Sequence, residues 1–302
     1  MLSIIVIRKE DKMKEEWEQR KKLFKWERGF GHSCKIPTKL LFKLDSNKNG
    51  CSALKFSNNG KYLAVAVTNE NKKSIINAYC IENDVKKCSI GYHHEIIHEM
   101  KWNSNDKYIM ACSSDCTAKI WRFKVLDDDY LFNNEKLLIC SLNHPSYVYS
   151  CEFVNSVNVI DKVKLFVLTA CHDGKIRMWM INTHAAEAND KFKIINEISL
   201  PIPPDVDQMR FGCIFPNAII MDTNNRIYCG DSNGCIHVWD FQMRETKIAM
   251  PFIKTIKEPE IIGDPINCIH LTQFDKSKLV VHSRDNCLRL IENSSHRQKV
   301  LQ

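Results

Sequence analysis

The hydrophobic positions of this chain fall into short alternating runs that are separated by polar turns. Four stretches share one arrangement, a polar turn followed by an alternating run: SSDCTAKIWRF, CHDGKIRMWMI, DSNGCIHVWDF and SRDNCLRLIEN. Alternation of apolar and polar residues with a period of two is typical of a half-buried β-strand. The pattern therefore predicts many short strands in the body of the chain.

These stretches are internal repeats, because each places a marked residue at the same point of its run. The marked residues, in chain order from the earlier unit IINAYCI, are Tyr79, Trp121, Trp179, Trp239 and Ile291. They follow one another at intervals of 42, 58, 60 and 52 residues. Six residues before the last four of them stand the turn residues Asp115, Asp173, Asn233 and Asp285.

Each repeat also contains further short strands in the same order. The third unit is the clearest, with the runs VYSCEFV, LFVLTACH, KIRMWMI and NEISL. Four short antiparallel strands per unit, repeated about an axis, describe the blades of a β-propeller. We therefore predict an all-β propeller within residues 34–302. Its units cover about 51–90, 96–143, 148–200, 217–258 and 265–302.

The Trp-bearing third strand, the turn aspartate and the histidine before the first strand resemble the WD40 repeat. The third unit matches best, with His144, Thr169, Asp173 and Trp179. The resemblance implies that these side chains form a buried hydrogen-bonded chain from imidazole through hydroxyl and carboxylate to indole. Such a chain gives every buried polar group a partner.

The other units depart from this pattern. The second keeps His93, Asp115 and Trp121 but has Ala111 at the hydroxyl position. The fourth keeps Asn233 and Trp239 but has Cys229 there and no matching histidine, and the fifth keeps Asp285 but has Val281 and lacks the tryptophan. We expect these blades to depend more on apolar packing.

The likeness extends to one family of WD40 proteins. The stretches WERGFGHSCKIPTKLLFKL, HHEIIHEMKWNSNDKYIMACSSDCTAKIW and HPSYVYSCEF resemble the propeller region of the jouberin family. The resemblance covers about residues 26–293. It implies a non-enzymatic protein-interaction scaffold, cytoplasmic and at the base of the cilium, that acts in cilium assembly and in the organisation of the transition zone and basal body. Its implied partners are other ciliary proteins.

Propellers of this family usually have seven blades, and an SH3 domain follows in many members. Only five units are recognisable here, which predicts an incomplete ring. Either the chain is a fragment or a short gene product, or its missing blades come from elsewhere. A generic WD40 adaptor in vesicle traffic or in a ubiquitin-ligase complex is the alternative function.

A remote alternative is a zinc peptidase, because HEIIH at 94–98 matches the H-E-x-x-H pattern. On a helix, His94 and His98 would share a face and bind one zinc ion. On a strand they would lie about 13 Å apart, which is too far. The segment stands at the start of the second unit, where a turn and a strand are expected. We therefore predict no catalytic, metal or cofactor site and no enzyme activity.

Composition narrows the partners further. Residues 1–40 hold 11 of the 43 Lys/Arg and 6 of the 36 Asp/Glu, so the remainder of the chain is nearly neutral. A basic stripe over the folded body is therefore not expected, and nucleic acid is not a predicted partner. No run approaches the roughly 20 apolar residues of a membrane helix. The 14 cysteines contain no C-x-x-C pair and most lie in apolar runs, which favours a reducing compartment.

The basic excess lies in a predicted N-terminal arm, residues 1–33. Within it, DKMKEEWEQRKKLFKW predicts a charged helix, because Glu16 precedes Arg20 and Glu18 precedes Lys22 by four residues. This helix is either a binding element for a partner or membrane surface, or a solvated lead into the propeller. The run KLLFKL that follows predicts an outer strand, one that could close the ring with the last blade.

Overall fold

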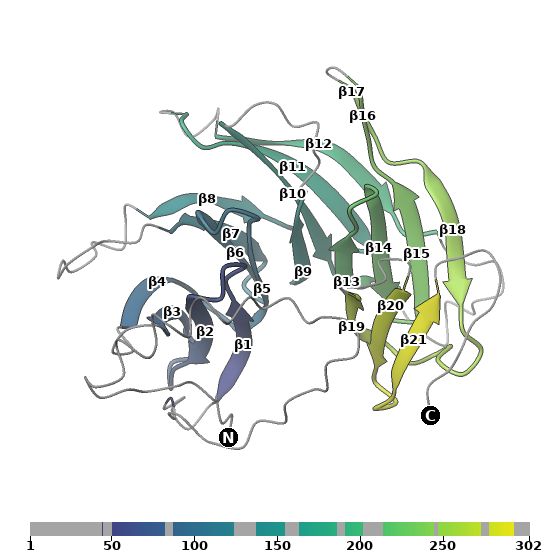
Figure 1. Cartoon of the computed structure of the whole chain (residues 1–302), viewed down its shortest axis with the longest axis horizontal. Coiled ribbons are helices and arrows are strands. Elements are labelled where there is room, and N and C mark those ends of the chain that lie inside the picture. The colour runs from purple at the N-terminus through teal and green to yellow at the C-terminus, as the bar shows by residue number, and fades with distance from the viewer. Residues whose placement is uncertain are drawn as a thin grey trace, which may run out of the picture.

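The computed structural model describes residues 44, 50–81, 87–123, 137–154, 163–185, 191–201, 214–244, 247–272 and 278–292. Within these ranges the chain is all-β, and consecutive strands form five antiparallel sheets that lie side by side (Figure 1). The predicted five-bladed propeller arrangement is confirmed. The predicted arm at 1–33 lies outside the described residues, as does the predicted outer strand KLLFKL apart from Leu44.

Each blade is a sheet of consecutive strands. The first comprises β1 (Cys51–Phe56), β2 (Tyr62–Thr68), β3 (Ser74–Cys80) and β4 (Lys87–His93). The second comprises β5 (Ile97–Trp102), β6 (Tyr108–Ser113), β7 (Thr117–Arg122) and β8 (Leu138–Asn143). The third comprises β9 (Val148–Phe153), β10 (Lys164–Cys171), β11 (Lys175–Asn182) and β12 (Phe192–Ser199).

The last two blades vary this plan. The fourth comprises β13 (Pro216–Met221), β14 (Arg226–Asp231), β15 (Cys235–Asp240) and β18 (Phe252–Lys257). A hairpin of β16 (Gln242–Arg244) and β17 (Lys247–Ala249) is inserted before β18. The fifth has three described strands, β19 (Ile266–Leu271), β20 (Lys278–Ser283) and β21 (Leu288–Glu292).

The core lies between neighbouring blades. One apolar cluster joins the first and second blades, and similar clusters join the second to the third, the third to the fourth and the fourth to the fifth. Trp121, Trp179 and Trp239 are each almost fully buried in the cluster between their own blade and the preceding one. Their equivalent surroundings explain the repeat, because each blade needs one large side chain to fill the wedge against its neighbour.

The turns between the second and third strands of the blades also repeat. In three blades the turn carboxylate accepts a backbone N–H from the residue two positions later: Asp115 from Thr117, Asp173 from Lys175, and Asp285 from Cys287. The residue between them adopts a positive φ: Cys116, Gly174 and Asn286. Asp, Asn and Gly favour such turns because they tolerate this conformation or stabilise it through the side chain.

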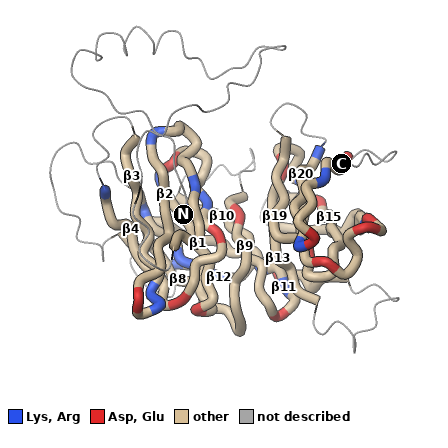
Figure 2. Tube along the Cα trace, turned by 90° about the horizontal axis from the view of Figure 1, so that it is seen from below, with Lys and Arg blue, Asp and Glu red and all other residues tan. Residues whose placement is uncertain are grey.

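The innermost strands contact one another in sequence, β1 with β5, β5 with β9, β9 with β13 and β13 with β19. In Figure 1 the blades form an arc with the first and the fifth at its two ends. Basic and acidic residues are intermingled over the strands and turns (Figure 2), as the near-neutral charge of this part of the sequence predicts. No described helix is long and apolar enough to cross a membrane.

Candidate protein-interaction site

The third blade brings three of its four predicted residues into one buried chain. The Trp179 indole Nε1–H donates to Thr169 Oγ1 at 2.9 Å, and Thr169 Oγ1 lies 2.8 Å from His144 Nε2. His144 Nδ1 lies 2.9 Å from the Leu142 carbonyl oxygen, so it carries the proton and Nε2 accepts from the hydroxyl. Burial lowers the pKa of His144 to about 4, which keeps this tautomer neutral.

Asp173 takes no part in this series of hydrogen bonds. Its carboxylate forms two hydrogen bonds with the Arg177 guanidinium, at 3.1 and 2.5 Å. Arg177 is nearly buried and also pairs with Glu197 at 2.8 Å. The guanidinium therefore joins the turn of this blade to its outer strand, while the hydroxyl alone joins imidazole to indole.

The second blade shows what happens without the hydroxyl. His93 Nδ1 contacts the Asp115 carboxylate at 2.9 Å, and the ring packs edge-on against Trp121. His93 Nε2 is buried and has no hydrogen-bond partner. Ala111 occupies the register position that Thr169 takes in the third blade. Burial lowers the pKa of His93, although the hydrogen bond to Asp115 opposes this.

The fourth blade contains, besides its apolar clusters, a buried histidine pair that the sequence prediction did not include. His237 and Asp231 form a fully buried pair, with 2.9 Å between Nε2 and Oδ2. His237 also contacts Thr255 Oγ1 at 2.9 Å. The predicted turn residue Asn233 donates its backbone N–H to the same Asp231, and Trp239 lies beside the His237 ring.

A position that the sequence prediction missed contributes the partner of the carboxylate in these pairs. Two residues before the marked position stand the basic residues Lys119, Arg177, His237 and Arg289. Arg289 pairs with the predicted Asp285 at 2.6 Å, and Lys119 lies 4.0 Å from Asp115. The signal was present in the sequence as a basic residue four positions after each turn residue. In the second, third and fifth blades this spacing places the basic side chain beside the turn carboxylate, whereas His237 of the fourth blade pairs with Asp231.

The H-E-x-x-H segment lies in the turn before β5 and in its first residues, not on a helix. The His98 ring contacts Ser114 Oγ at 2.7 Å, whereas the His94 ring packs against Tyr92. Among the residues that the structure describes, no group of three His, Cys, Asp or Glu side chains could hold a metal ion.

A polar clasp joins the innermost strands of three blades. Ser150 on β9 donates from Oγ to Glu99 on β5 at 2.5 Å, and the same Oγ accepts the backbone N–H of Ile219 on β13 at 2.9 Å. Below it, Lys101 bridges Glu99 and Glu152 at 3.1 and 3.0 Å. Burial by itself would lower the pKa of Lys101, but the two carboxylates outweigh it and raise that pKa.

Beside the clasp lies a group of rings that we call the aromatic surface. Its members are His98, Tyr147, Tyr149, His172 and Phe215. The rings are in contact: Tyr149 stacks on Phe215 with centroids 5.1 Å apart, and Phe215 lies 4.4 Å from His172. Tyr147 is 47% exposed, and the rings come from three blades. His98 and Tyr147 are exposed and the other three rings are half-buried. Clustered aromatic side chains that reach the surface are typical of protein-binding sites.

Comparison with known proteins agrees with this architecture. The family model "WD domain, G-beta repeat" matches residues 86–122 and 136–180. Jouberin from Rattus norvegicus is 30% identical over 281 residues, and jouberin from Mus musculus is 31% identical over the same length. Both alignments cover 91% of this chain. The chain is a jouberin-like WD40-repeat protein.

The jouberin-like chain spans 24% of the length of these two relatives. Since the alignments cover 91% of the chain, they include its central part, where the aromatic surface and the clasp lie. Next to them, a recess of about 120 Å³ is lined by residues of β5, β9, β13 and β19. Small-molecule sites typically measure about 300–1,000 Å³. The surface therefore suits contact with another protein better than capture of a cofactor.

Proposed function

We propose that this jouberin-like chain is a non-enzymatic scaffold that acts in cilium assembly and in the organisation of the transition zone and basal body. Its location would be the cytoplasm at the base of the cilium, and its partners would be ciliary proteins. The observation that carries the proposal is the similarity to jouberin along nearly the whole chain. A rigid propeller with an exposed aromatic surface supplies the physical means for docking.

The structure supports docking at the aromatic surface for a second reason. Tyr147 stands just before β9 and Tyr149 lies on it. Through Ser150, the clasp connects β9 to β5 on one side and to β13 on the other. Rigid aromatic rings lose little conformational entropy when a partner covers them, so their apolar area contributes fully to binding. The surface is therefore organised before the partner arrives.

The test is to express a tagged full chain in a ciliated cell and to compare two variants. We expect the unaltered chain to concentrate at the base of the cilium, and the double variant Tyr147→Ala/Tyr149→Ala to lose most of that signal. Tyr92→Ala is the matched control, because Tyr92 is 43% exposed and lies outside the aromatic surface. Diffuse cytosolic signal from the unaltered chain would contradict the ciliary function and favour a generic WD40 adaptor.

A further inference from the structure

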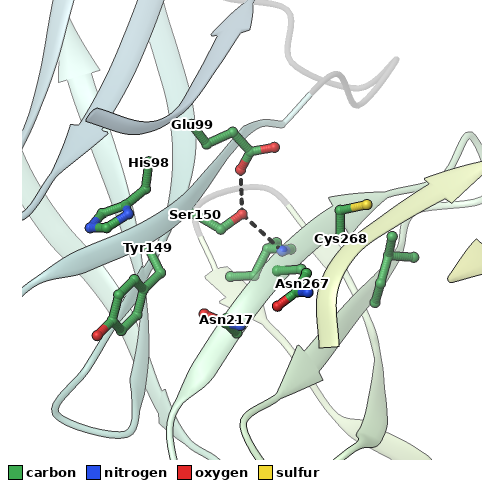
Figure 3. A pocket seen from close by; sticks show the side chains of 10 residues that line it. His98, Glu99, Tyr149, Ser150, Asn217, Asn267 and Cys268 are labelled. Carbon is green, nitrogen blue, oxygen red and sulfur yellow. Dashed lines mark hydrogen bonds between the residues drawn. The ribbon is translucent and has the colours of Figure 1, made fainter. Parts of the chain in front are cut away.

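The recess beside the clasp is small and has an unusual lining (Figure 3). Its polar and aromatic lining residues are His98, Glu99, Tyr149, Ser150, Asn217 and Asn267. A dry cavity of roughly 150 Å³ accommodates a benzene-sized group. A recess of about 120 Å³ therefore has room for one planar group, such as the end of a side chain from a partner protein.

Among the residues that line the recess, Glu99 is the one carboxylate, and no Lys or Arg is among them. Glu99 Oε2 accepts from Ser150 Oγ and from the Cys151 backbone N–H, and Lys101 lies 3.1 Å from Oε1. A carboxylate has about four acceptor positions, so one remains, and the Glu99 side chain is still 29% exposed. Behind the lining, Lys101 also pairs with Glu152, and Lys55 on β1 acts on the same two carboxylates. These charges balance one another, so the lining itself presents the Glu99 carboxylate to a ligand.

The walls also favour a cation. His98 and Tyr149 lie edge to face with ring centroids 5.0 Å apart, and aromatic faces attract cations through their quadrupole. Asn217 and Asn267 bring amide oxygens to the same recess, and the Asn217 amide is held by a hydrogen bond from Nδ2 to the Ile266 carbonyl at 2.9 Å. An anionic group would instead meet Glu99 directly.

We propose that this recess binds an arginine side chain of a protein partner. The guanidinium is planar, donates in several directions and stacks on aromatic rings, which matches a carboxylate flanked by two rings and two amides. The proposal rests on the proposed docking function, and it adds the chemistry of the group that the partner inserts. It also makes Glu99 a specificity-determining residue of this face.

The first experiment measures binding of an N-acetylated, C-amidated peptide Ala-Ala-Arg-Ala-Ala to the full chain by isothermal titration or NMR shifts. The comparison probe replaces the arginine by citrulline, which has nearly the same shape without the charge. We expect citrulline and the variant Glu99→Gln each to weaken binding by about tenfold or more, the scale of a charged hydrogen bond. Glu95→Gln, in the turn before β5, is the matched control and should bind normally. Equal affinity for the two peptides would overturn the proposal.

A second variant keeps the test decisive if Glu99→Gln disturbs the clasp. Asn267 is exposed on β19 and lines the rim of the recess. Asn267→Asp adds a carboxylate there and should tighten binding of the arginine peptide several-fold, with a steeper loss of affinity in salt. Unchanged affinity would overturn the proposal. If the peptide fails to bind while the chain still concentrates at the ciliary base, only the arginine assignment is lost. Peptide binding without ciliary localisation would contradict the proposed function alone.

Discussion

The second and third blades differ at the position that faces the buried histidine and tryptophan, and this difference shows how a propeller blade is held together. In the third blade, Thr169 bridges the Trp179 indole and the His144 imidazole. In the second, Ala111 stands at the equivalent position and His93 Nε2 is left without a partner. In both blades the tryptophan is almost fully buried and fills the space against the preceding blade. Apolar packing thus positions the ring, and the hydroxyl decides whether the polar atoms around it are satisfied.

The second blade makes room for its tryptophan in another way. Gly91 on β4 lies two residues before His93, as Leu142 lies two residues before His144. A Cβ at Gly91 would lie 2.2 Å from Trp121 Nε1. The bare backbone of Gly91 therefore lets the indole lie directly against the first blade, whereas the third blade places the larger Leu142 at this point.

The largest loss of stability is expected from a side chain at Gly91, where the Trp121 indole now lies. Gly91→Ala would force Trp121 or β4 to move, and we expect a cost of about 3 kcal/mol, the upper end of the usual range for overpacking. Urea unfolding followed by tryptophan fluorescence measures the loss. A change below about 1 kcal/mol would mean that the indole shifts freely, which would contradict the close fit of the first two blades.

Acid should weaken the third blade through His144. Its folded-state pKa of about 4 lies below the ordinary value of 6.5. The stability that neutral His144 provides is complete above about pH 6.5 and is lost as the pH falls towards about 4, to a total of about 3 kcal/mol. Unfolding free energies of the unaltered chain and of His144→Gln, compared at about pH 7 and about pH 4, isolate this share. Parallel pH profiles would show that His144 does not contribute.

Removing the bridging hydroxyl should make the third blade resemble the second. Thr169→Val keeps the shape of the side chain but leaves His144 Nε2 and the Trp179 indole without their shared partner. We expect a loss of about 2 kcal/mol, since unsatisfied buried polar groups cost about 1–3 kcal/mol. Thermal unfolding gives the value. Stability equal to that of the unaltered chain would mean that the bridge is dispensable.

The smallest effect is expected from the reverse change in the second blade. Ala111→Thr would place a hydroxyl beside His93 Nε2, which is free to accept because Nδ1 faces Asp115. Ala111→Val is the matched control, because it adds the same volume without the oxygen. We expect the threonine variant to exceed the valine variant by about 1 kcal/mol in unfolding free energy. Equal unfolding free energies of the two variants would show that a hydroxyl donor to His93 Nε2 does not stabilise the blade.

Much of the fold could be predicted from the sequence because its signals are local. Alternation with a period of two defined the strands, and in four units a turn aspartate or asparagine preceded the marked residue by a fixed six positions. The segment HEIIH was predicted to form a turn and the start of a strand because it stands at the beginning of the second repeat, and β5 begins at Ile97. The fourth strands of the first and fourth blades, β4 and β18, were not identified, because buried and exposed residues do not alternate regularly along them.

The candidate site was harder to predict because its residues meet only in space. The His237–Asp231 pair uses a carboxylate two residues before the expected turn position, so a search at fixed spacing passed over it. The aromatic surface combines His98, Tyr149 and Phe215, which stand in three different repeats. No periodic pattern marks residues that become neighbours only when the blades are assembled about the axis.

The sequence by itself determined the number of blades, the position of each tryptophan and the chemistry of each turn, because alternation and turn propensity act over a few residues. Only the tertiary structure decided which buried polar atoms find partners. Ser150 meets Glu99 across 51 positions of the chain and Ile219 across 69. Such pairs depend on how neighbouring blades pack, and that packing places a carboxylate, two rings and two amides around one recess.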